Sequence, residues 1–71
     1  GRPAEEAAMF DAYLAVRPSD VLAEEARVGR AVAWERAGNV QAERSAWQEL
    51  MRQNPTSPHS NRARQRRSEL R

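Results

Sequence analysis

The stretch AGNVQAERSAWQELMRQNP, residues 37–55, carries the signals that decide the fold. Gly38 is typical of the left-handed residue that ends a helix, and Asn39 is a typical cap of the helix that follows. The apolar side of this next helix consists of Val40, Trp47, Leu50 and Met51. Its polar side consists of Glu43, Arg44, Gln48, Glu49 and Arg52. Asn54 and Pro55 end the pattern, so the stretch predicts a helical turn followed by one amphipathic helix.

A similar pattern stands near the start of the chain. Pro3 suits the first turn of a helix, and Pro18 disfavours helical geometry at the residue before it, so a helix is expected over 3–17. Its larger and apolar positions recur at three- and four-residue spacing and form one broad stripe of Ala7, Met9, Phe10, Tyr13, Leu14 and Val16. No segment alternates apolar and polar residues with period two, so helix is the only regular structure expected.

Two further helices are predicted from caps and prolines. The second helix is expected to begin at Ser19 or Asp20, whose side chains can accept hydrogen bonds from its first amides. One line along it holds small or apolar residues, which let a neighbouring helix come close: Leu22, Ala26, Gly29, Ala33 and Ala37. The last helix is expected over 58–71, with Ser57 as its cap and Pro58 at its first position.

The charge of the chain is unevenly spread. Residues 1–51 hold six arginines and nine acidic residues, a net charge of −3, whereas residues 52–71 hold six arginines and one acidic residue, a net charge of +5. The last helix offers only Ala63 and Leu70 as an apolar line. One side against protein and the rest against water is typical of a terminal helix that caps a stack.

Size and composition argue against catalytic chemistry. The chain has 71 residues, and almost half of its hydrophobic residues are alanine, so few large side chains are left to enclose a cavity. It contains no cysteine and no lysine, and its one histidine, His59, has no second soft ligand near it in the sequence. We therefore expect no catalytic residue, no cofactor and no metal site. No apolar run is long enough to cross a membrane, so no insertion is expected.

The sequence aligns with itself at an offset of 37 residues. The aligned pairs that matter are apolar residues, prolines and arginines: Phe10 with Trp47, Tyr13 with Leu50, Leu14 with Met51, Pro18 with Pro55, Ala26 with Ala63, Arg27 with Arg64, and Arg30 with Arg67. The aromatic, apolar and proline positions agree with the helix boundaries expected from caps. The period and its punctuation therefore predict a repeat of antiparallel helical hairpins.

At this point the chain resembles the tetratricopeptide repeat family. Relative to the glycine of the hairpin turn, that family has small, aromatic, apolar and proline residues at fixed offsets, which correspond here to Ala31, Trp34, Trp47, Leu50 and Pro55. This chain departs from the family pattern at Arg30, where a leucine is usual, and at Glu43, where a small residue is usual. The resemblance implies an all-α fold of stacked antiparallel hairpins, a short solenoid of about four helices with both indoles held between them.

The segments RPSDVLAEEA, residues 17–26, and NPTSPHSNRA, residues 54–63, are similar to the longer repeats of some bacterial envelope and regulatory proteins. In that scheme the chain is a single repeat fragment, 1–71, with the second helix of a partial repeat at 3–17, one complete repeat at 20–55, and the terminal helix at 58–71. The helix order would be B-A-B-A. Either the cell envelope or the cytoplasm of a bacterium suits such a fragment of a larger protein.

The resemblance implies a non-catalytic module for protein interaction or scaffolding. Partners of this family usually bind on the concave face of the first helices, which here corresponds to Arg27, Arg30, Trp34, Arg64 and Arg67. Such guanidinium groups suit the carboxylates of an acidic peptide, but they equally suit solvent and local acidic neighbours. The apolar edge left by the uncovered first helix corresponds to Met9, Phe10 and Tyr13.

Two alternatives stay open from the sequence. The arginine-rich segment NRARQRRSELR, residues 61–71, could bind an anionic partner or nucleic acid, although no base-stacking aromatic residue or known motif accompanies it. The uncovered first helix could instead pair with a second copy and form a homo-oligomer, or it could be covered by preceding repeats of a longer chain.

Overall fold

The computed structural model describes residues 2–70, and these residues form four α-helices in sequence. The helices are α1 (Pro3–Val16), α2 (Ala23–Ala37), α3 (Val40–Gln53) and α4 (Ser60–Glu69). The predicted all-α stack of antiparallel helices is confirmed. Gly1 and Arg71, the ends of the predicted fragment 1–71, lie outside the described residues.

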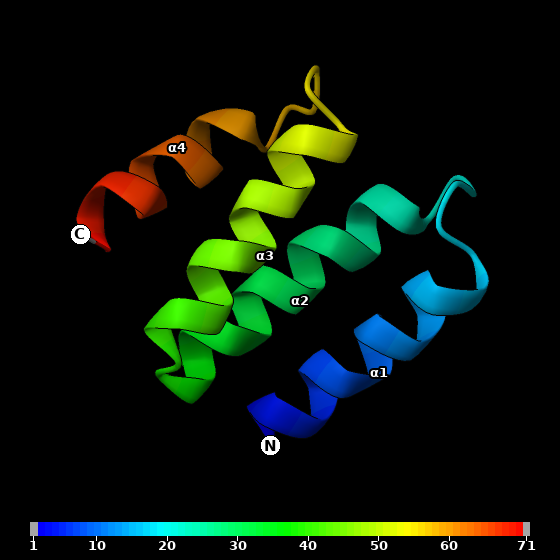
Figure 1. The fold of residues 1–71 in the computed structure, drawn as a ribbon, viewed down its shortest axis with the longest axis horizontal. Helices are drawn as coiled ribbons and strands as arrows, with labels where there is room; N and C mark the ends of the chain where they lie inside the picture. The colour runs from blue at the N-terminus through cyan, green and yellow to red at the C-terminus, as the bar shows by residue number, and fades with distance from the viewer. Residues whose placement is uncertain (1, 71) are drawn as a thin grey trace.

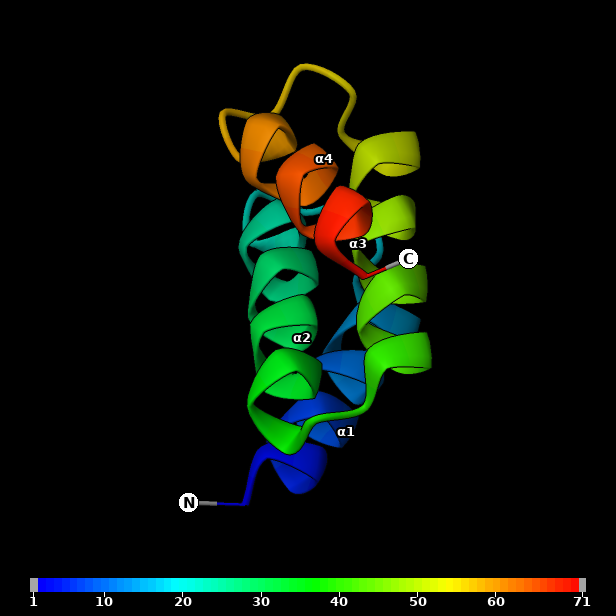
Figure 2. The same ribbon diagram turned by 90° about the vertical axis from the view of Figure 1, so that its left-hand side faces the viewer.

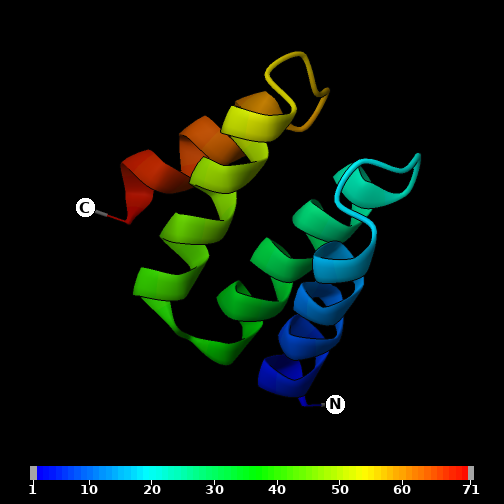
Figure 3. The same ribbon diagram turned by 45° about the vertical axis from the view of Figure 1, so that its right-hand side comes forward.

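The helices follow one another across the molecule in chain order (Figure 1). Each helix packs against the next one in the chain. Among the described residues, the backbones of α1 and α3 do not approach each other closely, and neither do those of α2 and α4. The α1–α2 and α3–α4 turns lie at the same end of the stack, and the α2–α3 turn lies at the other (Figure 3). The result is a thin body of 31 × 30 × 15 Å, in which α4 lies obliquely in front of α2 and α3 in the view of Figure 2.

The turn predicted at Gly38 and Asn39 is present in the structure. Gly38 has a φ of +76°, in the left-handed region that favours glycine, and its amide donates back to the last turn of α2. The Asn39 side chain accepts a hydrogen bond of 3.1 Å from the amide of Ala42 and so caps α3. Two neighbouring residues thus end one helix and begin the next.

Two helices begin later than expected. The second helix was expected at about residue 20 but begins at Ala23, because Asp20 Oδ1 accepts from the amide of Leu22 and holds a turn there instead. The last helix was expected from Pro58 but begins at Ser60, because the Ser57 hydroxyl accepts from the amide of His59 in a second turn. Both candidate caps therefore stabilise a turn and not the first amides of a helix.

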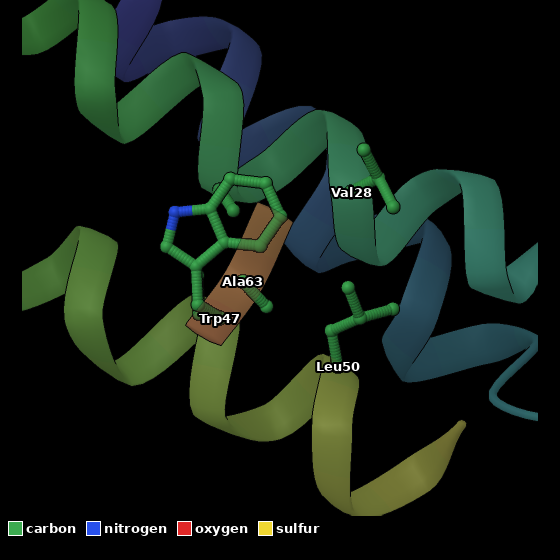
Figure 4. Close-up of a cluster of buried hydrophobic side chains, with 6 residues drawn as sticks. Val28, Trp47, Leu50 and Ala63 are labelled. Carbon is green, nitrogen blue, oxygen red and sulfur yellow. The ribbon is translucent and has the colours of Figure 1, made fainter. Parts of the chain in front are cut away.

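The main core lies between α2, α3 and α4 (Figure 4). Trp47 and Leu50 of α3 are fully buried there, and they pack with Val28, Ala31, Ala46 and Ala63. Burying side chains of this size contributes about 2 to 3 kcal/mol each to the free energy of folding. Trp34 is partly buried against the same cluster, so both indoles pack against the core as expected, with Trp47 fully buried and Trp34 partly buried.

A smaller cluster joins α1 to α2. Its buried residues are Leu14, Ala23 and Ala26, and the partly buried rings of Phe10 and Tyr13 pack against them. The stripe of small residues on α2 performs the function expected of it here, because a Cβ atom built on Gly29 would lie 2.5 Å from Cζ of Phe10. The absence of a side chain at Gly29 lets α1 lie this close.

Candidate functional site

An apolar groove runs along the surface between α1 and α2, and we call it the α1/α2 groove. Its volume is about 830 Å³, and its lining residues are Glu6, Met9, Phe10, Tyr13, Leu22, Glu25, Ala26, Gly29, Val32, Ala33 and Arg36. All three residues of the predicted apolar edge, Met9, Phe10 and Tyr13, line it. Met9 is 72% exposed, whereas the two aromatic rings are half-buried and form part of the wall.

The geometry of this groove is set by contacts beneath it. The Phe10 ring lies over Gly29, as described above. The Tyr13 hydroxyl donates a hydrogen bond to Oδ2 of Asp20, and this bond to a carboxylate raises the pKa of Tyr13 above its ordinary value. Tyr13 thus stays a neutral donor and is held in place at one end of the groove.

Three of the residues that line the groove are charged. Arg36 of α2 and Glu6 of α1 form an ion pair, with Nη1 of Arg36 3.5 Å from Oε1 of Glu6. Glu25 is exposed on α2 with no ion pair among the described residues. The lining of the groove is therefore mostly apolar and carries a net charge of −1, from Glu6, Glu25 and Arg36.

A second, more polar groove crosses α2 between α1 and α3, and we call it the α1/α3 groove. Its volume is about 490 Å³, and its lining includes Arg27, Arg30 and Trp34, three of the five residues of the predicted concave surface. The other two, Arg64 and Arg67, lie on α4 and are not part of this lining. The structure thus brings the α2 members of the predicted set together and leaves the α4 members outside the groove.

The arginines of the α1/α3 groove are used inside the chain. Arg27 is only 6% exposed, and it donates from Nη1 to Oδ1 of Asn54 (2.8 Å) and from Nη2 to the carbonyl of Pro18 (2.6 Å). Arg30 donates from Nη1 to Oδ1 of Asp11 at 2.9 Å. These bonds compete with any carboxylate of a partner, so Arg27 in particular is a structural residue of the two turns.

The α4 members of the predicted surface lie in different surroundings. Arg64 is exposed and donates from Nη2 to Oδ1 of Asn61 on its own helix at 3.1 Å. Arg67 is half-buried, and its Nε atom is buried without a hydrogen-bond partner. A single strip of four arginines stays a prediction, since the structure gives the four side chains different environments.

Glu43 is the residue that the sequence pattern placed wrongly. It was assigned to the polar side of α3, but it is 2% exposed and faces Trp47 and α4. It accepts from Nε1 of Trp47 (2.9 Å) and from Nε and Nη2 of Arg66 (2.7 and 2.9 Å). The signal for this position was its spacing of four residues from Trp47, which places both on one face of the helix.

These bonds set the ionisation of Glu43 and its partner. Burial alone would raise the pKa of the Glu43 carboxyl, but the hydrogen bonds from Arg66 and Trp47 outweigh burial and lower it below its ordinary value. The bonds to Glu43 raise the pKa of Arg66 in turn. The cluster is therefore an ion pair that holds α4 on α3, and it offers no free acid or base for chemistry.

The described residues offer no grouped metal ligands and no membrane-spanning helix. Between residues 2 and 70 no three histidine or acidic side chains are grouped so that they could hold a metal ion. Within the same range no helix combines the length and the apolar character needed for a membrane crossing. The candidate sites are thus the two grooves.

Comparison of the chain with protein-family models, with curated proteins and with solved structures found no match in any of the three. The resemblance to tetratricopeptide repeats is therefore a prediction that rests on the residues quoted above.

Proposed function

We propose that this chain is a non-catalytic module that binds a helix of a partner protein in the α1/α2 groove. The observation that carries the proposal is the exposed apolar lining of this groove, with Met9 at its edge. An exposed apolar groove can bind the apolar face of a partner, because binding removes this surface from water and so gains the free energy of burial.

A helical ligand suits the shape and the floor of this groove. The α2 side of the lining combines the small residues Ala26, Gly29 and Ala33 with the larger apolar residues Leu22 and Val32, of which Leu22 is exposed. The small residues of α2 are already covered by α1, so the apolar face of a bound helix would contact the exposed side chains of Met9 and Leu22 and the outer side of the Phe10 ring. Binding of an amphipathic helix by its apolar face is a common mode of peptide recognition.

The arginine-rich C-terminal helix gives less support to an anionic or nucleic-acid partner. Arg66 is engaged with Glu43 and Glu69, and Arg62 lies over the ring of Trp47, with its Cζ atom 5.5 Å from the ring centre. A phosphate would have to compete with these internal contacts for the same guanidinium groups. Arg71, the last arginine of this segment, lies outside the described residues.

The proposal can be tested by selection from a library of helical peptides. Peptides selected on the immobilised chain should bind the variant Met9→Gln about tenfold more weakly, since roughly one buried apolar side chain is lost from the complex. Val16→Gln is the matched control, because Val16 is a similarly exposed apolar residue of α1 outside the groove. Equal binding of the selected peptides to both variants would contradict the proposal.

A further inference from the structure

We propose that the helix bound in the α1/α2 groove resembles α2 in its apolar contacts but carries an arginine or lysine where α2 carries Glu35. The inference rests on the proposed function and specifies the partner's chemistry. It follows from a comparison of two surfaces within this one chain. One surface, on α3 and α4, is covered by α2, and the corresponding surface, on α1 and α2, is open.

The two surfaces correspond residue by residue at the offset of 37. On the α1 and α2 side the residues are Glu6, Phe10, Tyr13, Glu25, Ala26 and Gly29. The residues at the same places on α3 and α4 are Glu43, Trp47, Leu50, Arg62, Ala63 and Arg66. Every residue in the first set lines the α1/α2 groove, so the groove is the equivalent of the surface that α3 and α4 present to α2.

One face of α2 covers the second surface. Val28 and Ala31 pack there against Trp47, Leu50 and Ala63, and these three residues are fully buried as a result (Figure 4). Positions 28 and 31 are one turn apart, and both side chains are small enough for α2 to lie close to α3. A helix that fills the α1/α2 groove needs the same pair of small apolar residues to pack over Phe10, Tyr13 and Ala26.

The charged contacts of the two surfaces differ in sign. One turn beyond Ala31, Oε1 of Glu35 lies 3.7 Å from Nη2 of Arg62 and 4.0 Å from Nε of Arg66. At the corresponding places the groove has Glu25 and Gly29, so both positive charges are missing and one is replaced by a negative charge. A glutamate at this position of a bound helix would be repelled by Glu25, whereas an arginine or lysine would be attracted.

The other charged groups near this position do not change the sign. Glu6 occupies the place of Glu43 and adds a second carboxylate, and Arg36 already faces Glu6 at 3.5 Å. Glu25 is exposed and free to pair with the ligand. The groove therefore selects a basic residue at the position equivalent to Glu35, one turn after the second small residue.

Two synthetic peptides test this inference directly. Both comprise residues 20–38, with a hydrocarbon staple between positions 29 and 33 on the face turned away from the groove, and the second carries Glu35→Arg. We expect the Glu35→Arg peptide to bind the chain about fivefold more tightly at low salt, the size expected when a repulsive exposed pair becomes an attractive one. In the Glu25→Arg variant of the chain the preference should reverse, and in the control variant Glu5→Gln it should be unchanged.

The outcomes separate this inference from the proposed function. Titration followed by amide NMR should perturb Gly29 and Tyr13, whereas a peptide that displaced α2 from the core would perturb the indole signal of Trp47. Equal affinity of the two peptides, or a preference insensitive to Glu25→Arg, would overturn the inference while the library result keeps the groove as a binding site. Failure of both peptides where selected peptides bind would also overturn it. Sedimentation showing that a second copy fills the groove would overturn it too, in favour of homotypic assembly.

Discussion

A single buried carboxylate organises the α3–α4 contact. Glu43 would be costly to bury alone, because an ion in a protein interior loses its hydration. Three donor atoms from Trp47 and Arg66 replace that water. The same bonds orient the indole in the core and connect it to α4, whose described residues bury only Ala63 and Ser60. The ion pair therefore holds α4 against α3, where the apolar packing of α4 alone is sparse.

Removal of Arg66 should change both stability and its pH dependence. In Arg66→Met the Glu43 carboxylate is left buried with one donor, so we expect a loss of about 2 to 4 kcal/mol in the free energy of unfolding. In the wild-type chain the lowered pKa of Glu43 contributes stability that is present above pH 4 to 5 and is lost as the pH falls through the folded pKa. In the Arg66→Met variant we expect burial to dominate and to raise the pKa of Glu43. Acidification should then lower the free energy of unfolding by less than it does in the wild type.

Urea unfolding between neutral pH and pH 3 measures both effects. Arg64→Met is the matched control, since Arg64 is an exposed arginine of the same helix whose hydrogen bond goes to Asn61. We expect its unfolding free energy to stay within about 0.5 kcal/mol of the wild type. A wild-type and an Arg66→Met curve with the same slope on acidification would argue against the assigned role of Glu43.

Sequence reasoning identified Trp47 and missed Glu43 for a physical reason. Indoles at helical spacing are usually core residues, and the local pattern is enough to predict that. A glutamate is usually exposed, and its burial depends on donors from elsewhere in the fold. Arg66, the main donor, is 23 residues away on another helix, so no local pattern contains the pairing. The apolar edge at Met9 was predictable, because it depends only on the stripe along one helix.

At the scale of the elements, Arg27 connects the two turns at one end of the stack. It donates to the carbonyl of Pro18 in the α1–α2 turn and to the side chain of Asn54 at the end of α3. The resemblance to tetratricopeptide repeats predicted Arg27 as a partner-binding residue, because partners of that family usually bind on the concave face of the first helix of each hairpin. Its burial could not be inferred without knowing that both turns lie at the same end (Figure 3).

Arg27→Lys should lower the free energy of unfolding by about 1 to 3 kcal/mol. A lysine ammonium lacks the planar fork of a guanidinium and cannot reach both acceptors in the same geometry, so one buried acceptor is left unpaired. Arg64→Lys, at the equivalent position 37 residues later, is the control and should have little effect because Arg64 is exposed. Thermal or urea unfolding measures the stability of the two variants. Equal stability of Arg27→Lys and Arg64→Lys would mean that the hydrogen bonds of Arg27 contribute little to the free energy of unfolding.

The helix boundaries show the same division between local and non-local causes. The ends of α1 and α3 before Pro18 and Pro55, and the turn at Gly38, follow from backbone sterics and were predicted. The starts of α2 and α4 were predicted too early by two to three residues. Asp20 also accepts a hydrogen bond from Tyr13, and Ser57 donates one to Glu24. Each side chain is therefore held by a contact with another helix and does not cap the helix that follows it. A cap signal read from sequence alone cannot include such competing partners.

At the scale of the whole molecule, the stack is a one-dimensional arrangement. The central helices α2 and α3 pack on a helix at either side, whereas α1 and α4 each pack mainly on one (Figure 1). A chain of this length is expected to have only about 4 to 10 kcal/mol of stability in total. The outer helices therefore have the least to lose on opening, and α1 also leaves the apolar groove uncovered.

Hydrogen exchange followed residue by residue should reveal this order. Amides in the middle of α2 and α3, beside Val28 and Trp47, are expected to exchange most slowly. Amides of α1 should exchange faster, because α1 can open locally at a lower cost in free energy than global unfolding. A helical peptide in the α1/α2 groove should slow exchange in α1 and α2 by a factor that rises with its concentration, because only the closed form binds it. It should leave α4 unchanged, since α4 lies on the far side of the core. Uniform protection across all four helices, or protection by the peptide of α4 before α1, would contradict both the one-dimensional stack and the location of the site.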